Sequence, residues 1–464
     1  MNENQKTKIV ATIGPASDNY DTLKQLVQNG ITCIRVNFSH GSGKEHKIKY
    51  DTARQVAKDL NINLSLLLDT KGPEIRIGKM QDDIQLIEKN QTLKLICDST
   101  IYSTFIGNNK EVCVSYEMHN DLKEGDVVLL DDGKLKTVVT RIYDNVVEVL
   151  TSNSHNLKTN KRINIPGVDF SLPFLSQKDK DDVLFGIEYG VDIIAASFVN
   201  SKENIQELRS FLNENGGSHI KICSKIESQT AINNIDSIIE ASDSIMIARG
   251  DLGLEIPYYM VPNVERMIIK KCNKLNKEVI VATQMLDSME KNPLPTRAEV
   301  SDIYWANVLG ADATMLSGET ASGSWPVEAV KIMNKVNQQA MEDLFNDSKN
   351  YTEYLDSVLE ISDEEEQWAY DLAKEIYSSN EEAIIIATDD LKDLKVISKY
   401  RPKARIIVIS NDEKLKNSLG IMHNVFASNV DSDKYEDFLE NEDFWKEFES
   451  KHNLEDKEYT VLIK

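Results

Sequence analysis

The stretch Ile220–Asp251, IKICSKIESQTAINNIDSIIEASDSIMIARGD, contains one complete strand–helix–strand unit. Its two short, mostly apolar runs, Ile220–Ser224 and Ser244–Ala248, have the length and composition of β-strands. The amphipathic segment between the runs is long enough for a helical crossover, which is the connection that joins parallel strands. The stretch therefore predicts two parallel strands connected by a helix.

The same alternation recurs along most of the chain before residue 343. Short β-branched runs alternate with longer amphipathic segments, and eight such runs occur. Eight parallel strands with intervening helices are typical of a (β/α)8 TIM barrel. The predicted strands are 9–12, 31–36, 64–68, 193–196, 220–224, 244–248, 279–282 and 313–316, and the clearest helix signals are 201–212, 261–275, 297–309 and 327–340.

Two other parts of the chain differ in texture from this repeat. Residues 72–168 show short strand-like runs separated by turns, which predict a small β-barrel domain inserted into the third strand–helix connection. The main barrel is accordingly expected at 1–71 and 169–343. Residues 344–464 predict a C-terminal α/β domain. Its clearest elements are a helix at 365–377 and strands at 383–387 and 405–409.

Composition limits the possible partners. The chain has 76 acidic and 53 basic residues and a net charge of -23, which repels nucleic acid and anionic lipid. No run of about 18 apolar residues occurs, and the five cysteines show no metal-binding spacing, so they are expected to be small core residues in a reducing compartment. The acidic tail 431–449 is typical of a solvated helix face or of partial disorder. We expect a cytoplasmic protein without nucleic-acid or membrane partners.

Polar residues follow six of the eight predicted strands. In a TIM barrel the carboxyl ends of the strands meet at one mouth, where active sites form. One such residue alone is usually a helix cap or a loop residue, but their convergence predicts a single polar site. These residues are Arg35, Asn37, Ser39, Asp69, Thr70, Lys225, Glu227, Arg249, Asp251, Thr283, Ser317 and Glu319.

Lys225 and Glu227 are two residues apart and therefore project to the same side of a strand. One interpretation is a structural salt bridge between them. The other adds Asp251, because two carboxylates and substrate oxygens together satisfy an octahedral Mg²⁺ ion. Arg35 offers a planar fork that suits a phosphate or a carboxylate. The second interpretation favours phosphoryl transfer, and the first stays open.

Six short motifs resemble those of the pyruvate kinase family and occur in the family's order. The insertion at 72–168 also lies where the family carries a mobile lid. The likeness extends weakly to Ser398–Pro402 and then fades. The motifs are RVNFSHG at 35–41, DTKGPEIR at 69–76, KIE at 225–227, ARGDLG at 248–253, ATQML at 282–286 and LSGET at 316–320.

This resemblance implies an enzyme that transfers the phosphoryl group of phosphoenolpyruvate to ADP, the last step of glycolysis. It implies Mg²⁺ or Mn²⁺ as a cofactor, held by Glu227 and Asp251. It also implies that a water held by Thr283 is a candidate proton donor to the enolate of pyruvate. The residues implied to be catalytic are Lys225, Arg35 and Thr283, and those implied to bind the substrate are Arg35, Lys225, Gly250, Asp251 and Thr283.

The resemblance further implies K⁺ as a cofactor and a homotetramer as the assembly. In the family a glutamate at the position of Glu74 accompanies K⁺. The residues implied to hold K⁺ are Asn37, Ser39, Asp69 and Thr70. Those implied to meet the nucleotide phosphates are Asn37, Phe38, Ser39, His40, Arg76 and Lys178.

Two other functions are compatible with parts of the pattern. A Mg²⁺-dependent phosphoenolpyruvate or pyruvate lyase of the aldolase type would share the metal carboxylates, but not the inserted domain or the K⁺ residues. A non-catalytic metabolite-binding relative would keep the barrel alone, which the presence of Lys225, Glu227, Asp251 and Thr283 disfavours. The sequence leaves open the allosteric effector, the preferred nucleotide and the enolate's proton donor.

Fructose 1,6-bisphosphate should not activate this protein through the family's usual third-domain site. There the family has hydroxyl residues and a glycine that cradle a sugar phosphate, whereas this chain has Thr388–Leu394, TDDLKDL. Asp390 and Asp393 only accept hydrogen bonds when ionised, and Leu391 replaces the glycine. Titration with fructose 1,6-bisphosphate at sub-saturating phosphoenolpyruvate should leave the apparent affinity for phosphoenolpyruvate unchanged. A several-fold gain that Lys392→Ala abolishes would contradict this interpretation.

Overall fold

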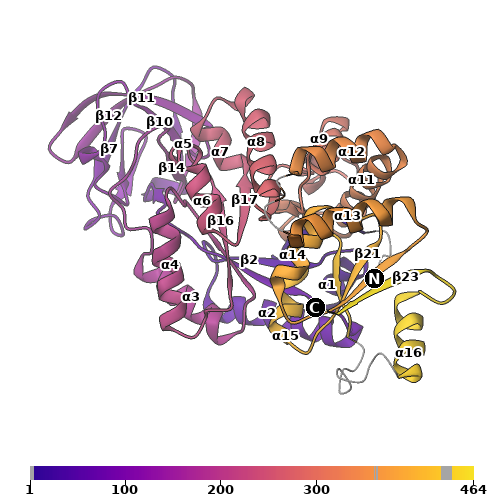
Figure 1. The fold of residues 1–464 in the computed structure, drawn as a ribbon. Coiled ribbons are helices and arrows are strands. Elements are labelled where there is room, and N and C mark those ends of the chain that lie inside the picture. Colours follow the sequence, from indigo (N-terminus) through magenta and orange to yellow (C-terminus); the bar gives the residue numbers. More distant parts are fainter. Residues whose placement is uncertain (1–4, 360, 362–363, 430–440, 464) are drawn as a thin grey trace.

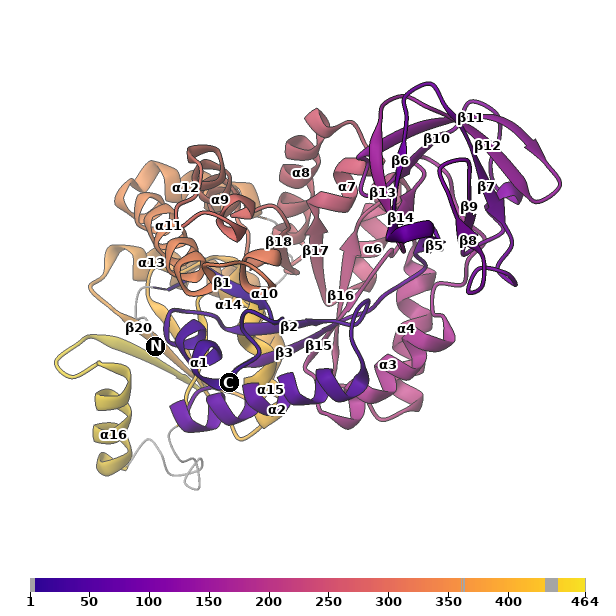
Figure 2. The same ribbon diagram turned by 180° about the vertical axis from the view of Figure 1, so that it is seen from behind.

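Eight parallel strands form a closed barrel between an all-β domain and a C-terminal domain (Figure 1; Figure 2, from behind). The computed structural model describes residues 5–359, 361, 364–429 and 441–463. The strand order is β1-β19-β18-β17-β16-β15-β3-β2, and β2 pairs with β1, so the predicted barrel is confirmed. The strands are β1 (Lys8–Thr12), β2 (Cys33–Asn37), β3 (Ser65–Asp69), β15 (Ile193–Ala196), β16 (Lys221–Ile226), β17 (Ser244–Ala248), β18 (Glu278–Ala282) and β19 (Ala313–Leu316).

Helices surround the barrel, and several begin at capping residues. Ser42, Ser176 and Thr296 each form a capping box with an acidic residue three positions later, which satisfies backbone N–H groups at the helix start. These capping residues therefore set where each preceding loop ends and the helix begins. The helices are α1 (Tyr20–Gln28), α2 (Gly43–Leu60), α3 (Gln177–Glu188), α4 (Lys202–Glu214), α5 (Gln229–Asn233), α6 (Ile235–Ala241), α7 (Arg249–Glu255), α8 (Val261–Lys274), α9 (Arg297–Leu309), α10 (Gly318–Ala321) and α11 (Pro326–Asn346).

Side chains along each barrel strand alternate between the interior and the surrounding helices. On β16, Ile222 belongs to the core under the helices, whereas Cys223 belongs to the core inside the barrel. Because the alternation has a period of two, Lys225 and Glu227 also face the interior, above Cys223. The carboxyl ends of the strands therefore direct alternate residues into one space. All five cysteines are buried and free, as expected.

The inserted segment forms a small closed sheet that acts as a lid over the barrel. Its strand order is β4-β14-β10-β11-β12-β7-β9, and a bridge between Ile77 and Val114 joins the two ends of that order. The turn at Gly133 lies against Leu254 of α7. The strands of this sheet are β4 (Ile75–Arg76), β7 (Thr92–Cys97), β9 (Glu111–Val114), β10 (Val127–Leu130), β11 (Leu135–Tyr143), β12 (Val146–Thr151) and β14 (Arg162–Asn164). Two further pairs are β5 (Lys79–Met80) with β8 (Ile106–Gly107), and β6 (Ile84–Ile87) with β13 (His155–Lys158).

The C-terminal domain is a four-stranded parallel sheet with helices, in the order β22-β21-β20-β23. The predicted strands at 383–387 and 405–409 are present, but the sequence interpretation missed the two outer strands. The acidic tail also contains a helix whose Phe444 and Phe448 are buried, while 430–440 lie outside the described residues. The elements are α12 (Ser348–Val358), α13 (Glu364–Ser378), β20 (Ala383–Ala387), α14 (Leu391–Lys399), β21 (Arg405–Ile409), α15 (Glu413–Asn417), β22 (Val425–Ala427), α16 (Glu442–His452) and β23 (Tyr459–Ile463).

The C-terminal domain closes the amino end of the barrel. Ile421 belongs to the core inside the barrel, and Gly420 bonds through its N–H to Ser65 Oγ at 2.8 Å and through its carbonyl to Thr32 Oγ1 at 2.7 Å. This plug leaves the carboxyl end as the accessible mouth. Among the described residues, no helix is long and apolar enough to cross a membrane.

Gly420→Ala should destabilise the protein, because a methyl group there would lie 2.3 Å from both the Thr32 carbonyl oxygen and Ser65 Oγ. Backbone atoms cannot easily move aside, so we expect a loss of about 1–3 kcal/mol in the free energy of unfolding. Gly43→Ala is the control, since only the Phe185 ring approaches that position, at 3.7 Å. Urea unfolding should separate the two variants; equal midpoints would show that the plug adapts.

Candidate active site

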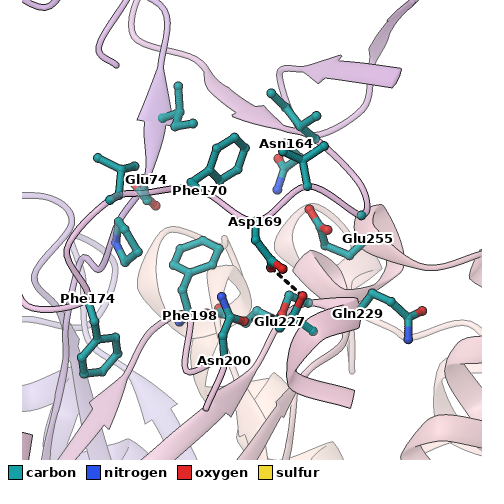
Figure 3. A pocket seen from close by; sticks show the side chains of 18 of the residues that line it. Glu74, Asn164, Asp169, Phe170, Phe174, Phe198, Asn200, Glu227, Gln229 and Glu255 are labelled. Carbon is teal, nitrogen blue, oxygen red and sulfur yellow. Dashed lines mark hydrogen bonds between the residues drawn. The ribbon is translucent and has the colours of Figure 1, made fainter. Parts of the chain in front are cut away.

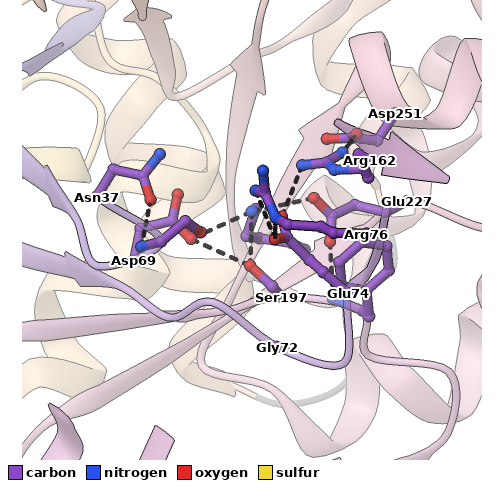
Figure 4. Close-up of polar contacts among 12 residues, drawn as sticks. Asn37, Asp69, Gly72, Glu74, Arg76, Arg162, Ser197, Glu227 and Asp251 are labelled. Carbon is purple, nitrogen blue, oxygen red and sulfur yellow. Dashed lines mark hydrogen bonds and ion pairs between the residues drawn. The ribbon is translucent and has the colours of Figure 1, made fainter. Parts of the chain in front are cut away.

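A cavity of about 70 Å³ lies at the carboxyl end of the barrel, beneath the lid (Figure 4). Its lining comes from seven barrel strands or their following loops and from the two lid arms. The lining residues that the sequence predicted are Arg35, Asn37, Ser39, Asp69, Lys225, Glu227, Asp251 and Thr283. The structure therefore brings most of the predicted site together.

Asp69 is the centre of the polar network in this cavity. Its Oδ2 accepts from Arg35 Nε at 2.6 Å, and its Oδ1 lies 3.1 Å from Lys225 Nζ. Burial alone would raise the pKa of Asp69, but the two cations outweigh it and lower that pKa. Asp69 thus stays ionised and fixes both cations at the mouth.

Lys225 is held by three groups. Its Nζ lies 3.1 Å from Asp69, 3.0 Å from Glu227 Oε1 and 2.7 Å from Ser197 Oγ. Burial acts to lower the pKa of Lys225, yet the carboxylates of Asp69 and Glu227 raise it above its ordinary value. The salt bridge expected as one interpretation is therefore present. Lys225 also presents a permanent positive charge at the cavity.

Glu227 is only 1% exposed, and its carboxylate is less well compensated than that of Asp69. Burial and the nearby Asp251 raise its pKa to about 7, although Lys225 acts in the opposite direction. Its Oε2 accepts from the backbone N–H of Phe198 at 2.7 Å. Phe198 has φ 56°, a left-handed conformation that is costly for an aromatic residue. This backbone conformation directs the N–H of Phe198 toward the Glu227 carboxylate.

Glu227 and Asp251 fit a hard divalent cation by the chemistry of their donors. Both offer carboxylate oxygens that line the same cavity, and Asp251 acts with burial to raise the pKa of Glu227, as expected for two carboxylates that share one space. No cluster of three or more His, Cys, Asp or Glu side chains suited to a metal occurs in the part of the chain that the structure describes. A cation here would need further oxygens from a substrate or water.

The residues predicted to hold K⁺ lie on two adjoining strand ends. Asn37, Ser39 and Asp69 line the cavity, and the N–H of Ser39 donates to Asn37 Oδ1 at 2.9 Å. Thr70 is buried beside them, and its Oγ1 accepts from the N–H of Ser197 at 3.1 Å. Their side chains offer oxygen atoms, which suit a monovalent cation.

The residues predicted to bind nucleotide lie beside the same mouth. Lys178 Nζ donates to the carbonyl of Phe38 at 3.1 Å, and partial burial and then Arg76 lower the pKa of His40. The ring of Phe38 is buried against the rings of Tyr50 and Phe185. Phe38 can therefore reach a nucleotide only through its backbone.

Thr283 and Gly250 meet at the ends of β18 and β17. The N–H of Gly250 donates to Thr283 Oγ1 at 2.7 Å, and that hydroxyl donates to the Ala282 carbonyl at 2.6 Å. Thr283 has φ 67°, so its position is another strained one at the mouth. Thr283 Oγ1 would need to change partners before Gly250 could bind a substrate carboxylate.

A second cavity of about 320 Å³ lies beside the first, under the returning lid arm (Figure 3). Both cavities include Glu74, Arg162, Phe198 and Glu227 in their linings. Across it, Thr230 donates to Asp169 at 2.6 Å. Its walls combine apolar side chains, such as Phe170 and Phe174, with polar and charged ones, such as Asn200 and Glu255.

The sequence interpretation missed Phe198, described above, and three further site residues. Ser197 follows the fourth strand, and Thr12 ends the first strand and accepts from Arg35 Nη1 at 2.7 Å, so the rule about strand ends would have found both had it been applied to all eight strands. Arg162 comes from the lid. It bonds to Glu74 Oε1 at 2.9 Å and to Asp251. Nothing local in the sequence marks Arg162, since only the fold brings it to the barrel.

Comparisons with known proteins agree with this geometry. The family model "Pyruvate kinase, barrel domain" matches residues 4–330. The chain belongs to the pyruvate kinase family. A pyruvate kinase of Mycoplasma pneumoniae is 40% identical, covering 92% of this chain and 90% of its own, and one of Bacillus licheniformis is 42% identical, covering 91% and 72%. The crystal structure of a Cryptosporidium parvum pyruvate kinase matches with a TM-score of 0.85 and 36% identity, over 92% of this chain and 87% of that one.

Membership of the pyruvate kinase family confirms the resemblance predicted from the six motifs. It supports a phosphotransferase over the aldolase-like lyase and the non-catalytic relative. The pyruvate kinase match ends at residue 330, near the end of the barrel, whereas the matches to whole relatives cover most of the chain.

Glu227→Gln should stabilise the metal-free protein at high pH. The folded state holds the Glu227 proton more tightly than the unfolded chain does, so stability falls as pH rises from about 4.5 to about 7. An amide removes this loss, and we expect a gain of roughly 2 kcal/mol at pH 8 and little gain at pH 5. Urea unfolding at both pH values, with a chelator present, measures the free energy of unfolding, and the exposed Glu214→Gln variant is the control. The same gain at both pH values would contradict the assignment.

Proposed function

We propose that the cavity at the barrel mouth transfers the phosphoryl group of phosphoenolpyruvate to ADP, giving pyruvate and ATP in the last step of glycolysis. The observation that carries this proposal is the charge of Lys225, which Asp69 and Glu227 hold beside Arg35 in one small cavity. Phosphoryl transfer asks little covalent chemistry of the protein, because positioning and charge compensation lower the barrier.

Arg35 and Lys225 act on the transferring group. Both cations are fixed before substrate arrives, since Asp69 bonds to each of them, and a fixed charge needs no reorganisation as negative charge develops. Arg35 binds the phosphate with its planar fork, and Lys225 stabilises the phosphoryl group as it moves. Asp69 is then the positioning residue for the pair.

Glu227 and Asp251 are proposed to hold Mg²⁺ or Mn²⁺, and Asn37, Ser39, Asp69 and Thr70 to hold K⁺. The donor oxygens of these residues suit both ions, and Glu74 lines the same cavity. When bound, the ions would compensate the charge of the phosphates. The N–H of Phe198 keeps Glu227 oriented for this role.

The remaining contacts follow from the same layout. Gly250, Asp251 and Thr283 are proposed to bind the substrate carboxylate, with the Thr283 hydroxyl, through a water, as the candidate proton donor to the enolate. Nucleotide phosphates are proposed to contact two groups of residues beside the mouth. The first group, at the end of β2 and in the loop after it, is Asn37, Phe38, Ser39 and His40. The second group is Arg76 on the lid arm and Lys178 on α3. We further propose a cytoplasmic homotetramer as the working form, as the resemblance to the family implies.

Lys225→Met should lower kcat by about 100-fold or more, because its charge matters most as phosphoryl charge develops, while phosphoenolpyruvate binding stays largely intact. A coupled assay of pyruvate formed from phosphoenolpyruvate and ADP measures this, and the exposed Lys202→Met is the control. Unchanged turnover would remove Lys225 from the mechanism. No pyruvate from the unmodified protein would refute the proposed function.

A further inference from the structure

Arg162 is a lid residue whose side chain reaches the barrel mouth. It lies in β14, paired with Arg76 of β4 at the base of the lid. Its Nη2 donates to Glu74 Oε1 at 2.9 Å, and its Nη1 donates to Asp251 at the start of α7. Figure 4 shows the side chain of Arg162 beside Asp251. A cation on the lid is therefore bonded to a carboxylate on the barrel.

The charges around the smaller cavity show what this cation does. The lining contains three cationic side chains and four carboxylates, and one of the carboxylates, Glu74, also pairs with Arg76 just outside the lining, at 2.7 Å. The positive and negative charges therefore balance while Arg162 is in place. Without Arg162 one negative charge would be left in excess in a space that Glu227 and Asp251 both line. The cations are Arg35, Arg162 and Lys225, and the carboxylates are Asp69, Glu74, Glu227 and Asp251.

A divalent cation and Arg162 compete for the same group. Mg²⁺ requires oxygen ligands at about 2.0–2.1 Å in octahedral order, so a ligating oxygen of Asp251 has no room for a guanidinium in the same position. Displacement would leave Arg162 with two contacts, Glu74 and the ring of Phe198, whose centroid lies 5.9 Å from the guanidinium carbon. The Arg162 side chain is 21% exposed and can rearrange.

The displaced guanidinium would stand beside the metal with a free N–H group. An arginine fork binds phosphoryl oxygens through paired hydrogen bonds, which a lysine or a metal ion does not do. Arg162 also arrives from the lid, whereas Arg35 and Lys225 arrive from the barrel. It would thus contact the phosphoryl group from another side of the cavity.

We propose that Arg162 is a further catalytic residue: it pairs with Asp251 in place of the divalent cation when the site is empty, and contacts the transferring phosphoryl group once the cation is bound. This inference rests on the proposed function. Because Arg162 belongs to the lid and Asp251 to the barrel, cation binding also changes a bond between the two domains.

The first test measures Mn²⁺ binding to the substrate-free full-length protein by electron paramagnetic resonance. Arg162→Gln removes the competitor and should tighten Mn²⁺ binding by roughly 10-fold. Arg162→Lys keeps the charge and should bind Mn²⁺ within about twofold of the unmodified protein. Arg141→Gln, on strand β11 of the lid, is the matched control and should change nothing. Unchanged or weaker Mn²⁺ binding by Arg162→Gln would overturn the competition.

The second test measures turnover at saturating substrates and metal. Arg162→Gln should lower kcat by about 100-fold although it binds Mn²⁺ more tightly, and Arg162→Lys should recover only part of the loss. A purely structural role would instead lower the unfolding temperature and weaken Mn²⁺ binding. Unchanged kcat would overturn the phosphoryl contact. If the unmodified protein makes no pyruvate, the proposed function fails, while tighter Mn²⁺ binding by Arg162→Gln would still support the pairing with Asp251.

Discussion

In a closed parallel barrel, each strand must send alternate side chains into the interior, and the polar site depends on that constraint. Cys33, Leu67 and Cys223 fill the interior of the barrel. Two residues further along the same strands, Arg35, Asp69 and Lys225 take the next interior positions, at the mouth. The same packing that builds the apolar core therefore converges the charges, with no additional element to place them.

Burying several charges together is energetically unfavourable, and the structure compensates the buried carboxylates to different extents. Asp69 is compensated by two cations, and its pKa is lowered accordingly. Glu227 is equally buried but lies near Asp251, and its pKa rises to about 7. The proposed binding of cations requires some negative charge to be left unmatched in their absence, so stability would be given up where that function needs it. The left-handed backbone at Phe198 and Thr283 fits the same pattern.

The two other domains act at opposite ends of the barrel. The C-terminal domain inserts Ile421 at the amino end and so completes the interior core. The lid covers the carboxyl end, where its paired arms bring Arg76 and Arg162 over the mouth. One end is therefore sealed by apolar packing, and the other is closed by ion pairs, which ligands can exchange more readily than packed apolar contacts.

The sequence by itself determined the strand–helix repeat, the inserted β domain and the residues at six strand ends, because periodicity and strand-end position are local properties. The strand that follows the acidic tail was missed, since β23 becomes a strand only by pairing with β20. The tertiary structure alone decided that Arg162 meets Asp251, 89 positions away in the chain, and that Gly250 bonds to Thr283. Such contacts depend on how domains and loops close over the barrel, which no local pattern records.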